Sequence, residues 1–325
     1  MKFILRRLGF YLLALFVAVT LDFVLPRLLP GDPAAAILAP MGSRMTDVQI
    51  QALRQALGLN EAPLIQQYFT FLTHIFQGDL GISYSQFPAP VVQVIGTGLK
   101  WTVLLGGSSL IISVVLGHLI GILGAWRRRS LFDIVMPPLF NFIGAFPAFF
   151  LSLGVLFIFG LRLHWFPISH AASDTIPPAF SPEYIGSVLK HLVMPLTVSV
   201  LVNLQIWIQQ MRNVMISVLA EDYITMAEAK GLSQMRIMLG YAARNAILPS
   251  VTGFGIFLGS ILSGQVLIEQ VFSYPGLGFL MVSAVGARDY PLMGGLFLGI
   301  TVGVLLVNFL VDIIYTWIDP RVRSS

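Results

Sequence analysis

Residues 101–125 read WTVLLGGSSLIISVVLGHLIGILGA, and Trp126 and the basic run Arg127-Arg128-Arg129 follow directly. Apart from His118, the stretch contains no titratable side chain. A helix needs about 20 apolar residues to cross the hydrocarbon core of a bilayer. The stretch is therefore predicted to be a transmembrane helix that ends at a basic loop. Gly117 and Gly121 are four residues apart, a spacing that allows close contact with a neighbouring helix.

Five further stretches are apolar enough to cross a membrane, at approximately residues 8–26, 134–160, 188–210, 248–271 and 291–317. The composition agrees, because 56% of the residues are hydrophobic and only 10% are charged, whereas a soluble domain would carry about 25% charged residues. Cysteine is absent, which excludes disulfides, thiolate metal sites and cysteine nucleophiles. The dispersed formal charge of +4 gives no indication of nucleic-acid binding. The predicted fold class is an all-α membrane protein with six transmembrane helices.

Basic residues in the short loops predict the orientation of these spans. If six spans alternate, most basic loop residues fall on one side and the opposite side holds fewer, although its loops are longer, so both termini are expected in the cytoplasm. These residues are Lys2, Arg6, Arg7, Arg127, Arg128, Arg129, Arg212, Lys230, Arg236, Arg244, Arg321 and Arg323. The first span could alternatively be a cleaved signal peptide, since Ala34-Ala35-Ala36 follows it. Its apolar stretch is longer than a usual signal h-region, which favours a retained helix.

The expected domain organisation has three parts. Residues 1–26 form the cytoplasmic N-terminus and the first span, residues 27–100 an external segment, and residues 101–325 the other five spans. Within the external segment, the capping box Thr46-Asp47-Val48-Gln49 predicts a helix that Gly58 ends, and Pro63 predicts the start of a second. The glycines of Gly78-Asp79-Leu80-Gly81 would end the second helix. Both helices are expected on the outer membrane surface, with their apolar faces packed on the membrane domain.

The sequence contains no catalytic or metal-binding motif. It lacks the P-loop pattern G-x-x-x-x-G-K-[ST], so the chain is not expected to hold ATP phosphates in that manner. H-E-x-x-H and G-x-S-x-G are also missing. The five histidines show no metal-ligand spacing. We expect no catalytic residue, no metal site and no cofactor in this chain.

The loop after the fourth span contains the segment Glu221–Gly231, which reads EDYITMAEAKG. An acidic start favours a helix N-terminus, and Gly231 can end the helix. Ser233 can then cap a second helix that leads to Pro249 and the fifth span. On the first helix, one face would carry Ala220, Tyr223, Ile224 and Ala227, and another Glu221, Thr225 and Glu228. Periodicity alone leaves two interpretations open: a knob that another protein grips, or an interfacial helix on anionic headgroups.

The order of motifs along nearly the whole chain resembles the permease subunits of ABC importers. Ala227 to Gly231 and then Arg244-Asn245-Ala246-Ile247-Leu248-Pro249 resemble the family's EAA loop, in the form typical of the peptide/nickel branch. Further matching motifs are Arg6-Arg7, Pro30-Gly31-Asp32-Pro33, Leu57-Gly58-Leu59, Gln67-Tyr68, Gly78-Asp79-Leu80-Gly81-Ile82-Ser83, Glu269, Val271-Phe272-Ser273-Tyr274-Pro275-Gly276-Leu277-Gly278, Arg288-Asp289-Tyr290-Pro291, Asn308, Asp312 and Asp319-Pro320-Arg321. The chain departs from the general pattern at Thr225 and Met226, where the family has Glu and Ala, and at Tyr241, often His in this branch.

The resemblance implies a division of labour among subunits. A second, usually non-identical permease subunit would complete the pathway, and two ATP-binding cassette ATPases would bind ATP and Mg. An extracytoplasmic substrate-binding protein would deliver short peptides or a similar polar solute. Within a coupling loop spanning 211–249, the residues implied to couple to the ATPase are Glu221, Asp222, Tyr223, Ala227, Glu228 and Gly231. Membrane lipid is the remaining partner, and nucleic acid is not expected.

Polar residues inside the spans are further functional candidates, because their exposure to lipid is costly. Gln205 and Gln209 share a face of the fourth span and are the candidates for lining a water-filled pathway. Asn308 and Asp312 share a face of the sixth span, where interhelical or backbone bonding is favoured over substrate contact. His118 is expected to be packed and hydrogen-bonded. Asp22 and Glu269 lie near the outer ends of their spans, where a wet boundary is one interpretation.

Alternative functions remain open at this point. Within the resembling family, the cargo could be an oligosaccharide or a metal chelate instead of a peptide. From another class, an ion-coupled secondary transporter would use the intramembrane Asp and His residues as a relay, although no inverted repeat is detected. An intramembrane enzyme is disfavoured, because no nucleophile or metal pattern is present.

Overall fold

The computed structural model describes residues 2–28 and 63–318. This part of the chain is helical and contains no strand, only an isolated antiparallel bridge between Ile82 and Pro90. The chain divides into two compact units. Residues 1–101 and 276–325 form the first unit, and residues 102–275 form the second. The predicted boundaries at residues 26 and 100 stay a prediction.

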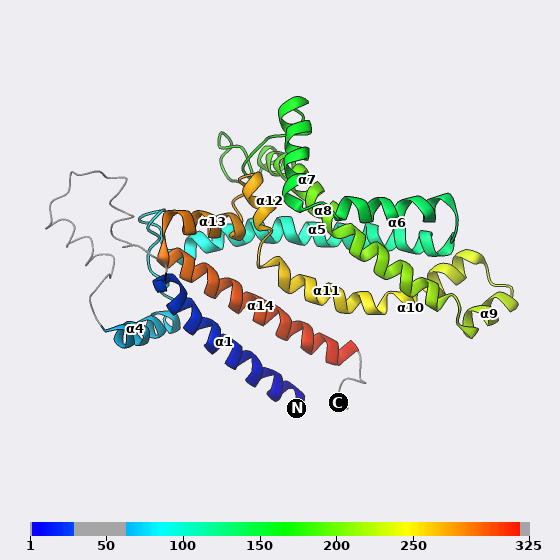
Figure 1. Cartoon of the computed structure of the whole chain (residues 1–325), viewed down its shortest axis with the longest axis horizontal. Coiled ribbons are helices and arrows are strands. Elements are labelled where there is room, and N and C mark those ends of the chain that lie inside the picture. The colour runs from blue at the N-terminus through cyan, green and yellow to red at the C-terminus, as the bar shows by residue number, and fades with distance from the viewer. Residues whose placement is uncertain (1, 29–62, 319–325) are drawn as a thin grey trace. The chain divides into compact units, whose positions relative to one another are not determined.

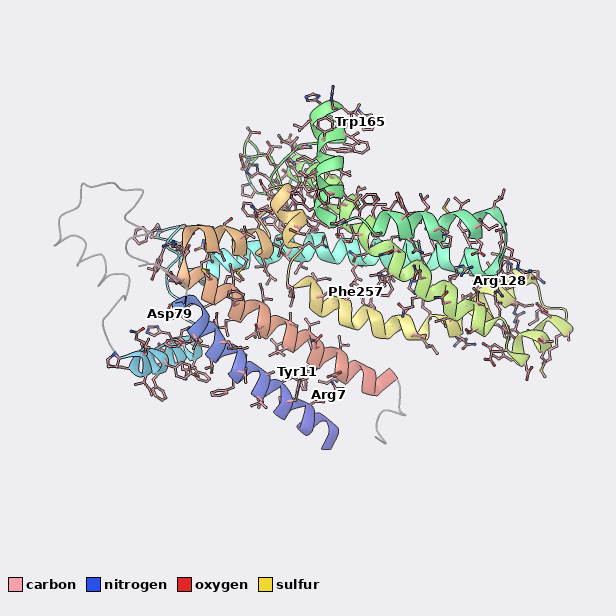
Figure 2. The ribbon with its side chains drawn as sticks, viewed as in Figure 1. Arg7, Tyr11, Asp79, Arg128, Trp165 and Phe257 are labelled. Atoms are coloured by element: carbon pink, nitrogen blue, oxygen red, sulfur yellow. The ribbon has the colours of Figure 1, made fainter. Side chains whose placement is uncertain are left out.

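In the first unit, α1 (Lys2–Leu28) packs along α14 (Tyr290–Ile318), and the two helices run side by side in Figure 1. Their contact includes a carboxylate with two donors: Arg7 donates to Asp312 across 2.6 Å, and the Tyr11 hydroxyl donates to the same oxygen across 2.6 Å. Arg7 and Tyr11 are labelled on α1 in Figure 2. The predicted interhelical bonding of Asp312 is confirmed.

The segment between α1 and the next long helix contains α4 (Leu64–Phe76), which begins directly after Pro63 as predicted. The other helix predicted in this segment, between residues 46 and 58, lies outside the described residues. Gly78 and Gly81 follow α4 with φ of +73° and +80°, a left-handed conformation that glycine adopts without steric cost. These two residues turn the chain towards α5.

The helix α5 (Val91–Trp126) begins well before the predicted start at residue 101. An additional short helix, α13 (Leu277–Ala287), was not predicted as an element of its own. It ends at Arg288, whose left-handed φ of 54° leads into α14. The first turns of α5, α13 and the start of α14 share an apolar core made of Val91, Val94, Leu277, Leu280, Ala284, Leu292, Met293 and Leu296.

In the second unit, the predicted third span is broken. It comprises α6 (Leu131–Gly144), α7 (Ala148–Val155) and the π-helical turn η2 (Leu156–Arg162), and the chain bends by 97° between the first and second parts. Figure 1 shows α7 turning away from α6. Pro147 has no N–H to donate and stands before α7 with an extended ψ of 135°, which ends the helical ladder. Pro137 and Pro138 lie inside α6 without such a break.

The predicted fourth span is α8 (Pro182–Val218), which packs against α6 and against α5. Gly117 of α5 faces Trp207, and a Cβ at this position would lie 2.4 Å from the Trp207 Cβ. A Cβ at Gly121 would lie 2.8 Å from the Ile208 carbonyl oxygen. The small-residue contact predicted for Gly117 and Gly121 is therefore present, because the backbone of α8 occupies the space of a side chain.

The predicted fifth span is shorter than expected. It consists of α11 (Leu248–Ile261) and, after a break at Gly264 with φ of +75°, the separate helix α12 (Val266–Val271). Among the described residues, four helices are long and apolar enough to cross a membrane, or five if α6 and α7–η2 form one bent span. The all-helical, membrane-capable architecture is confirmed, whereas the predicted count of six spans is not.

Candidate functional site

A short helix, α9 (Asp222–Ala229), is present where the sequence predicted one. Glu221 is the N-cap residue in an extended conformation, and Asp222 is the first residue of the helix. Two acidic residues therefore stand at the start of α9. Negative charge at this end is favourable because the helix dipole is positive there. The helix ends at Ala229 with Lys230 as its C-cap, and Gly231 follows with φ of +71°. The chain therefore reverses at the glycine that the motif supplies.

The inner face of α9 packs on the protein's own core. Ile224 and Ala227 are buried in an apolar cluster with the ends of α5 and α8 and the segment after α9. The other buried members of the cluster are Ala125, Met211, Met215, Ile237, Met238, Ala242, Ala243 and Ala246. Ala220 and Tyr223 do not join this buried face, since both are exposed. The predicted apolar face is therefore narrower than the periodicity indicated, and Ala227 is not available to a partner.

The outer face of α9 is exposed and mostly acidic. Glu221, Asp222 and Glu228 are exposed, and Thr225 lies among them. Met226 is the most exposed large apolar side chain of the helix, at 59%. This face thus combines three carboxylates with one projecting apolar side chain, and none of these residues is taken up by the core.

The segment after α9 supports the helix through the motif Arg244-Asn245-Ala246. It contains the π-helical stretch η3 (Arg236–Ala243) and α10 (Arg244–Ala246), which leads into α11. The Asn245 amide donates to the Tyr223 hydroxyl across 3.1 Å and to the Tyr241 carbonyl across 2.9 Å. Ala246 is fully buried in the same cluster as Ile224. The motif Arg244-Asn245-Ala246 is therefore joined to α9 by a hydrogen bond to Tyr223 and by a shared apolar cluster.

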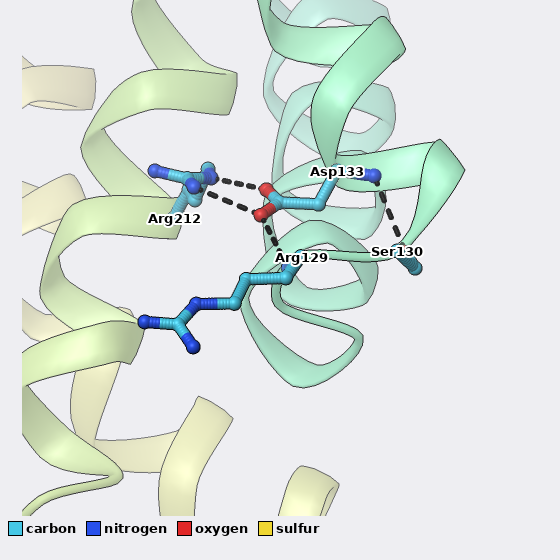
Figure 3. A network of polar contacts seen from close by, with 4 residues as sticks. All are labelled: Arg129, Ser130, Asp133 and Arg212. Atoms are coloured by element: carbon cyan, nitrogen blue, oxygen red, sulfur yellow. Dashed lines mark hydrogen bonds and ion pairs between the residues drawn. The ribbon is translucent and has the colours of Figure 1, made fainter.

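A partly buried ion pair joins α8, one of the helices that support α9, to α6, and sequence reasoning missed it. Arg212 of α8 donates to both carboxylate oxygens of Asp133 on α6, across 2.6 and 3.0 Å (Figure 3). The Arg129 amide donates to Asp133 across 3.0 Å, and Ser130 caps the helix by accepting from the Asp133 amide. The pattern Ser130-x-x-Asp133 directly after three arginines was the available signal, since it is a capping box.

The two predicted pathway residues both bond to α6. Gln205 donates to the Gly144 carbonyl across 3.4 Å, and Gln209 donates to the Asn141 side chain. Gln209 is exposed, whereas Gln205 is half-buried against Gly144. The structure gives both a helix–helix contact, and their lining of a pathway stays a prediction.

The other polar residues of the spans are packed within their units. His118 is buried, its ring bonds the Val114 carbonyl across 2.6 Å, and it stacks near Trp207, as predicted. Glu269 is fully buried and accepts from the Thr102 hydroxyl across 3.0 Å, so the wet-boundary interpretation is wrong for this residue. Asp22 is also buried, near Gly294. Within the described residues, no group of three or more His, Cys, Asp or Glu could hold a metal ion.

Two more of the quoted motifs meet in the first unit. Asp289 is fully buried and accepts on one carboxylate oxygen from the Ser83 hydroxyl, across 2.5 Å, and from the Ser85 amide and hydroxyl, across 2.9 and 2.8 Å. Its other oxygen accepts from the Leu292 amide in the first turn of α14. These bonds fix the segment after α4, which includes Ser83 and Ser85, to the start of α14 at Asp289.

Two family models of known proteins together match nearly the whole chain. Residues 92–324 match the family model described as binding-protein-dependent transport system inner membrane component. Residues 1–98 match the model of the N-terminal part of such components. The chain belongs to this permease family. The expected relationship to permeases of peptide ABC importers is confirmed, and the permease is a membrane protein.

Three relatives are similar to this permease over nearly their full lengths. The probable D,D-dipeptide transport system permease protein of Escherichia coli K12 is 35% identical, with 93% of this chain and 92% of the relative covered. The di/tripeptide transport system permease protein of Pseudomonas aeruginosa is 34% identical, with 100% and 99% covered. The dipeptide transport system permease protein of Escherichia coli K12 is 33% identical, with the same shares covered.

Proposed function

We propose that this permease is the pore-forming subunit of an ATP-driven importer for short peptides, and that α9 couples it to an ATPase. The observation that carries the coupling assignment is the division of α9 into two faces. Its inner face is anchored in the core of its own unit, while its outer face is free to meet another protein. A helix fixed in this way transmits a push to α5 and α8, because packed interiors yield little.

The charge of α9 argues against the alternative in which it lies on lipid. An interfacial helix inserts its apolar face into the headgroup region and carries Lys and Arg on its polar face. Here Ile224 and Ala227 are already packed on protein, and the outer face carries Glu221, Asp222 and Glu228. Anionic headgroups would repel these carboxylates. A protein groove with basic groups and a pocket for Met226 is the better complement.

The family, and the absence of a P-loop from this sequence, support an assembly with several other subunits. A second permease subunit, two ATPases that bind ATP and Mg, and an extracytoplasmic binding protein are the proposed partners. The basic loops support a cytoplasmic location for α9 and both termini by the positive-inside rule. The names of the relatives favour di- or tripeptides as cargo over oligosaccharides or metal chelates.

The ion-coupled alternative loses its support in the structure. Asp312 is bound by Arg7 and Tyr11, and Glu269 is bound by Thr102. A proton or ion relay would require these carboxylates to change partners during transport. No observation in the described residues favours this function over the ATP-driven one.

Transport by the reconstituted complex tests the proposed function. The permease, its partner subunits and the binding protein would be placed in proteoliposomes, and uptake of a labelled dipeptide would be measured with ATP inside the vesicles. We expect uptake only when both ATP and the loaded binding protein are present. Uptake driven by a membrane potential in the absence of ATP would contradict the proposal, and uptake of an oligosaccharide but not of peptides would contradict the cargo.

A further inference from the structure

The helix α4 has a wider apolar face than its neighbour in the structure covers. At about 100° per residue, its apolar side chains occupy one continuous arc of about 160°, and its Gln, Thr and His side chains occupy the other side. The apolar arc contains Leu64, Ile65, Tyr68, Phe69, Phe71, Leu72, Ile75 and Phe76. Such a division is the pattern of a helix that lies at a boundary between apolar and polar surroundings.

One half of this arc packs on α1. The Tyr68 hydroxyl and the Thr20 hydroxyl lie 2.9 Å apart in a hydrogen bond. The Phe23 ring contacts Tyr68 and Phe71, with centroids 5.1 and 5.5 Å apart. Phe23 is buried by these contacts. Tyr68 and Phe71 are therefore packed on α1 within the first unit, whereas Leu64 in the first turn is exposed.

The other half of the arc is exposed. Ile65, Phe69 and Phe76 are 71%, 63% and 88% exposed. At about 100° per residue these three side chains lie within about 40° of one another. They form a single stripe, the α4 stripe, next to the face that contacts α1.

The position of the α4 stripe along α1 indicates what covers it. The apolar window of α1 that can cross a membrane is Arg7–Val24, and the residues that hold α4, Thr20 and Phe23, lie at the end of this window. The α4 helix is thus attached at the level where the span leaves the hydrocarbon core. Tyr and Trp are enriched at this level of a bilayer, and Tyr68 of α4 stands there.

We propose that α4 is an interfacial helix whose stripe of Ile65, Phe69 and Phe76 is inserted in the lipid boundary beside α1. The polar side, with Gln66, Thr70 and Thr73, faces water. Since α4 contains no Asp, Glu, Lys or Arg, its insertion rests on apolar area and does not require anionic lipid. The helix anchors the segment between α1 and α5 to the membrane surface.

Site-directed spin labelling tests this proposal, because this chain has no native cysteine and each variant, labelled before assembly with its partners, carries a single label. Phe69→Cys and Ile65→Cys would be labelled on the stripe, with Thr70→Cys and Gln66→Cys as matched controls one residue further along the same helix. The assembled transporter would be placed in nanodiscs of neutral phosphatidylcholine. The accessibility of each label to oxygen, which concentrates in lipid, would be compared with its accessibility to a water-soluble nickel chelate.

We expect oxygen to exceed the nickel chelate several-fold at positions 65 and 69, and the ratio to reverse at positions 66 and 70. Adding anionic lipid should leave these ratios unchanged. Labels on the stripe that are as accessible to nickel as the controls would overturn the proposal, because the stripe would then lie in water. Labels protected from both reagents would also overturn it, because protein would then cover the stripe.

Discussion

The Asn245 amide donates a hydrogen bond to the Tyr223 hydroxyl across 3.1 Å and so joins α10 to α9. Beneath this bond, Ile224 and Ala246 are buried in the same apolar cluster. The contact connects a residue at the start of the short helix to the motif that leads into α11. The proposed coupling helix is therefore joined to the segment that leads into α11 by a hydrogen bond and by a shared apolar cluster.

Removing the hydroxyl should weaken this connection. Tyr223→Phe keeps the ring and loses only the acceptor, so we expect a stability loss of about 0.5–1 kcal/mol, typical of one partly exposed hydrogen bond. Asn245→Ala should cost somewhat more, because its bond to the Tyr241 carbonyl is lost as well. In thermal unfolding of the purified complex, the double variant should lose less than the two single losses added together. Strictly additive losses would show that the two side chains do not interact.

The bidentate pair of Arg212 and Asp133 should contribute more to the stability of the fold than the Tyr223–Asn245 hydrogen bond does. The Asp133 side chain is only 5% exposed, so Arg212→Ala would leave a buried carboxylate unpaired, at a cost of about 3 kcal/mol. Arg212→Lys should restore only part of this, because an ammonium cannot form the planar two-bond contact. The joint change Asp133→Asn with Arg212→Met should be milder than Arg212→Ala alone. Melting temperatures of the purified variants measure this order, and equal losses for all of them would contradict it.

Two glycines of α5 provide a matched test of helix packing. Gly117→Ala would place a Cβ 2.4 Å from the Trp207 Cβ, whereas a Cβ at Gly107 would meet nothing within 4 Å. We expect Gly117→Ala to cost about 1–3 kcal/mol, because α5 and α8 would be forced apart. Gly107→Ala should be neutral or stabilising by up to about 1 kcal/mol, since alanine is the better helix former. Thermal unfolding should separate the two variants, and similar melting temperatures would contradict the observed contact.

Asp289 and Asp79 form a second matched pair, because they differ in burial. Asp289→Ala would leave the Ser83, Ser85 and Leu292 donors without their buried acceptor, at a cost of about 2 kcal/mol. Asp79 is largely exposed, so Asp79→Ala should lose only about 0.5 kcal/mol. Limited proteolysis of the segment between α4 and α5 gives a local readout. Faster cleavage in the Asp289 variant alone is expected, and equal rates would show that the buried cluster does not hold this segment.

Local signals explain what the sequence could predict. The long helices α1, α5, α8 and α14 follow from apolar length, and α9 follows from an acidic start and the glycine at 231. The resemblance of ordered motifs gave the family. Each of these features depends on residues that are close in the chain or on their order along it.

The remaining features depend on which helices meet. Pro137 and Pro138 continue a helix while Pro147 breaks one, and composition does not distinguish them. The partner of Asp133 is 79 residues away, on a helix whose rotation the sequence does not specify. Periodicity placed Tyr223 with Ile224 on one face, but only Ile224 reaches the core. The bonds of Gln205 and Gln209 to α6 could not be predicted either, because the sequence does not specify which helix faces them.

The measurement that tests the central claim most directly is ATPase stimulation by the loaded binding protein in the reconstituted complex. Met226→Asp adds a charge to the outer face of α9, and Met235→Asp makes the same change at a methionine that is similarly exposed, at 62%, beyond the helix. Neither side chain is part of the core, so both variants should fold and assemble. We expect Met226→Asp to abolish most of the stimulation and Met235→Asp to retain it. Full stimulation in the Met226 variant, or equal loss in both, would contradict the assignment of α9 as the coupling helix.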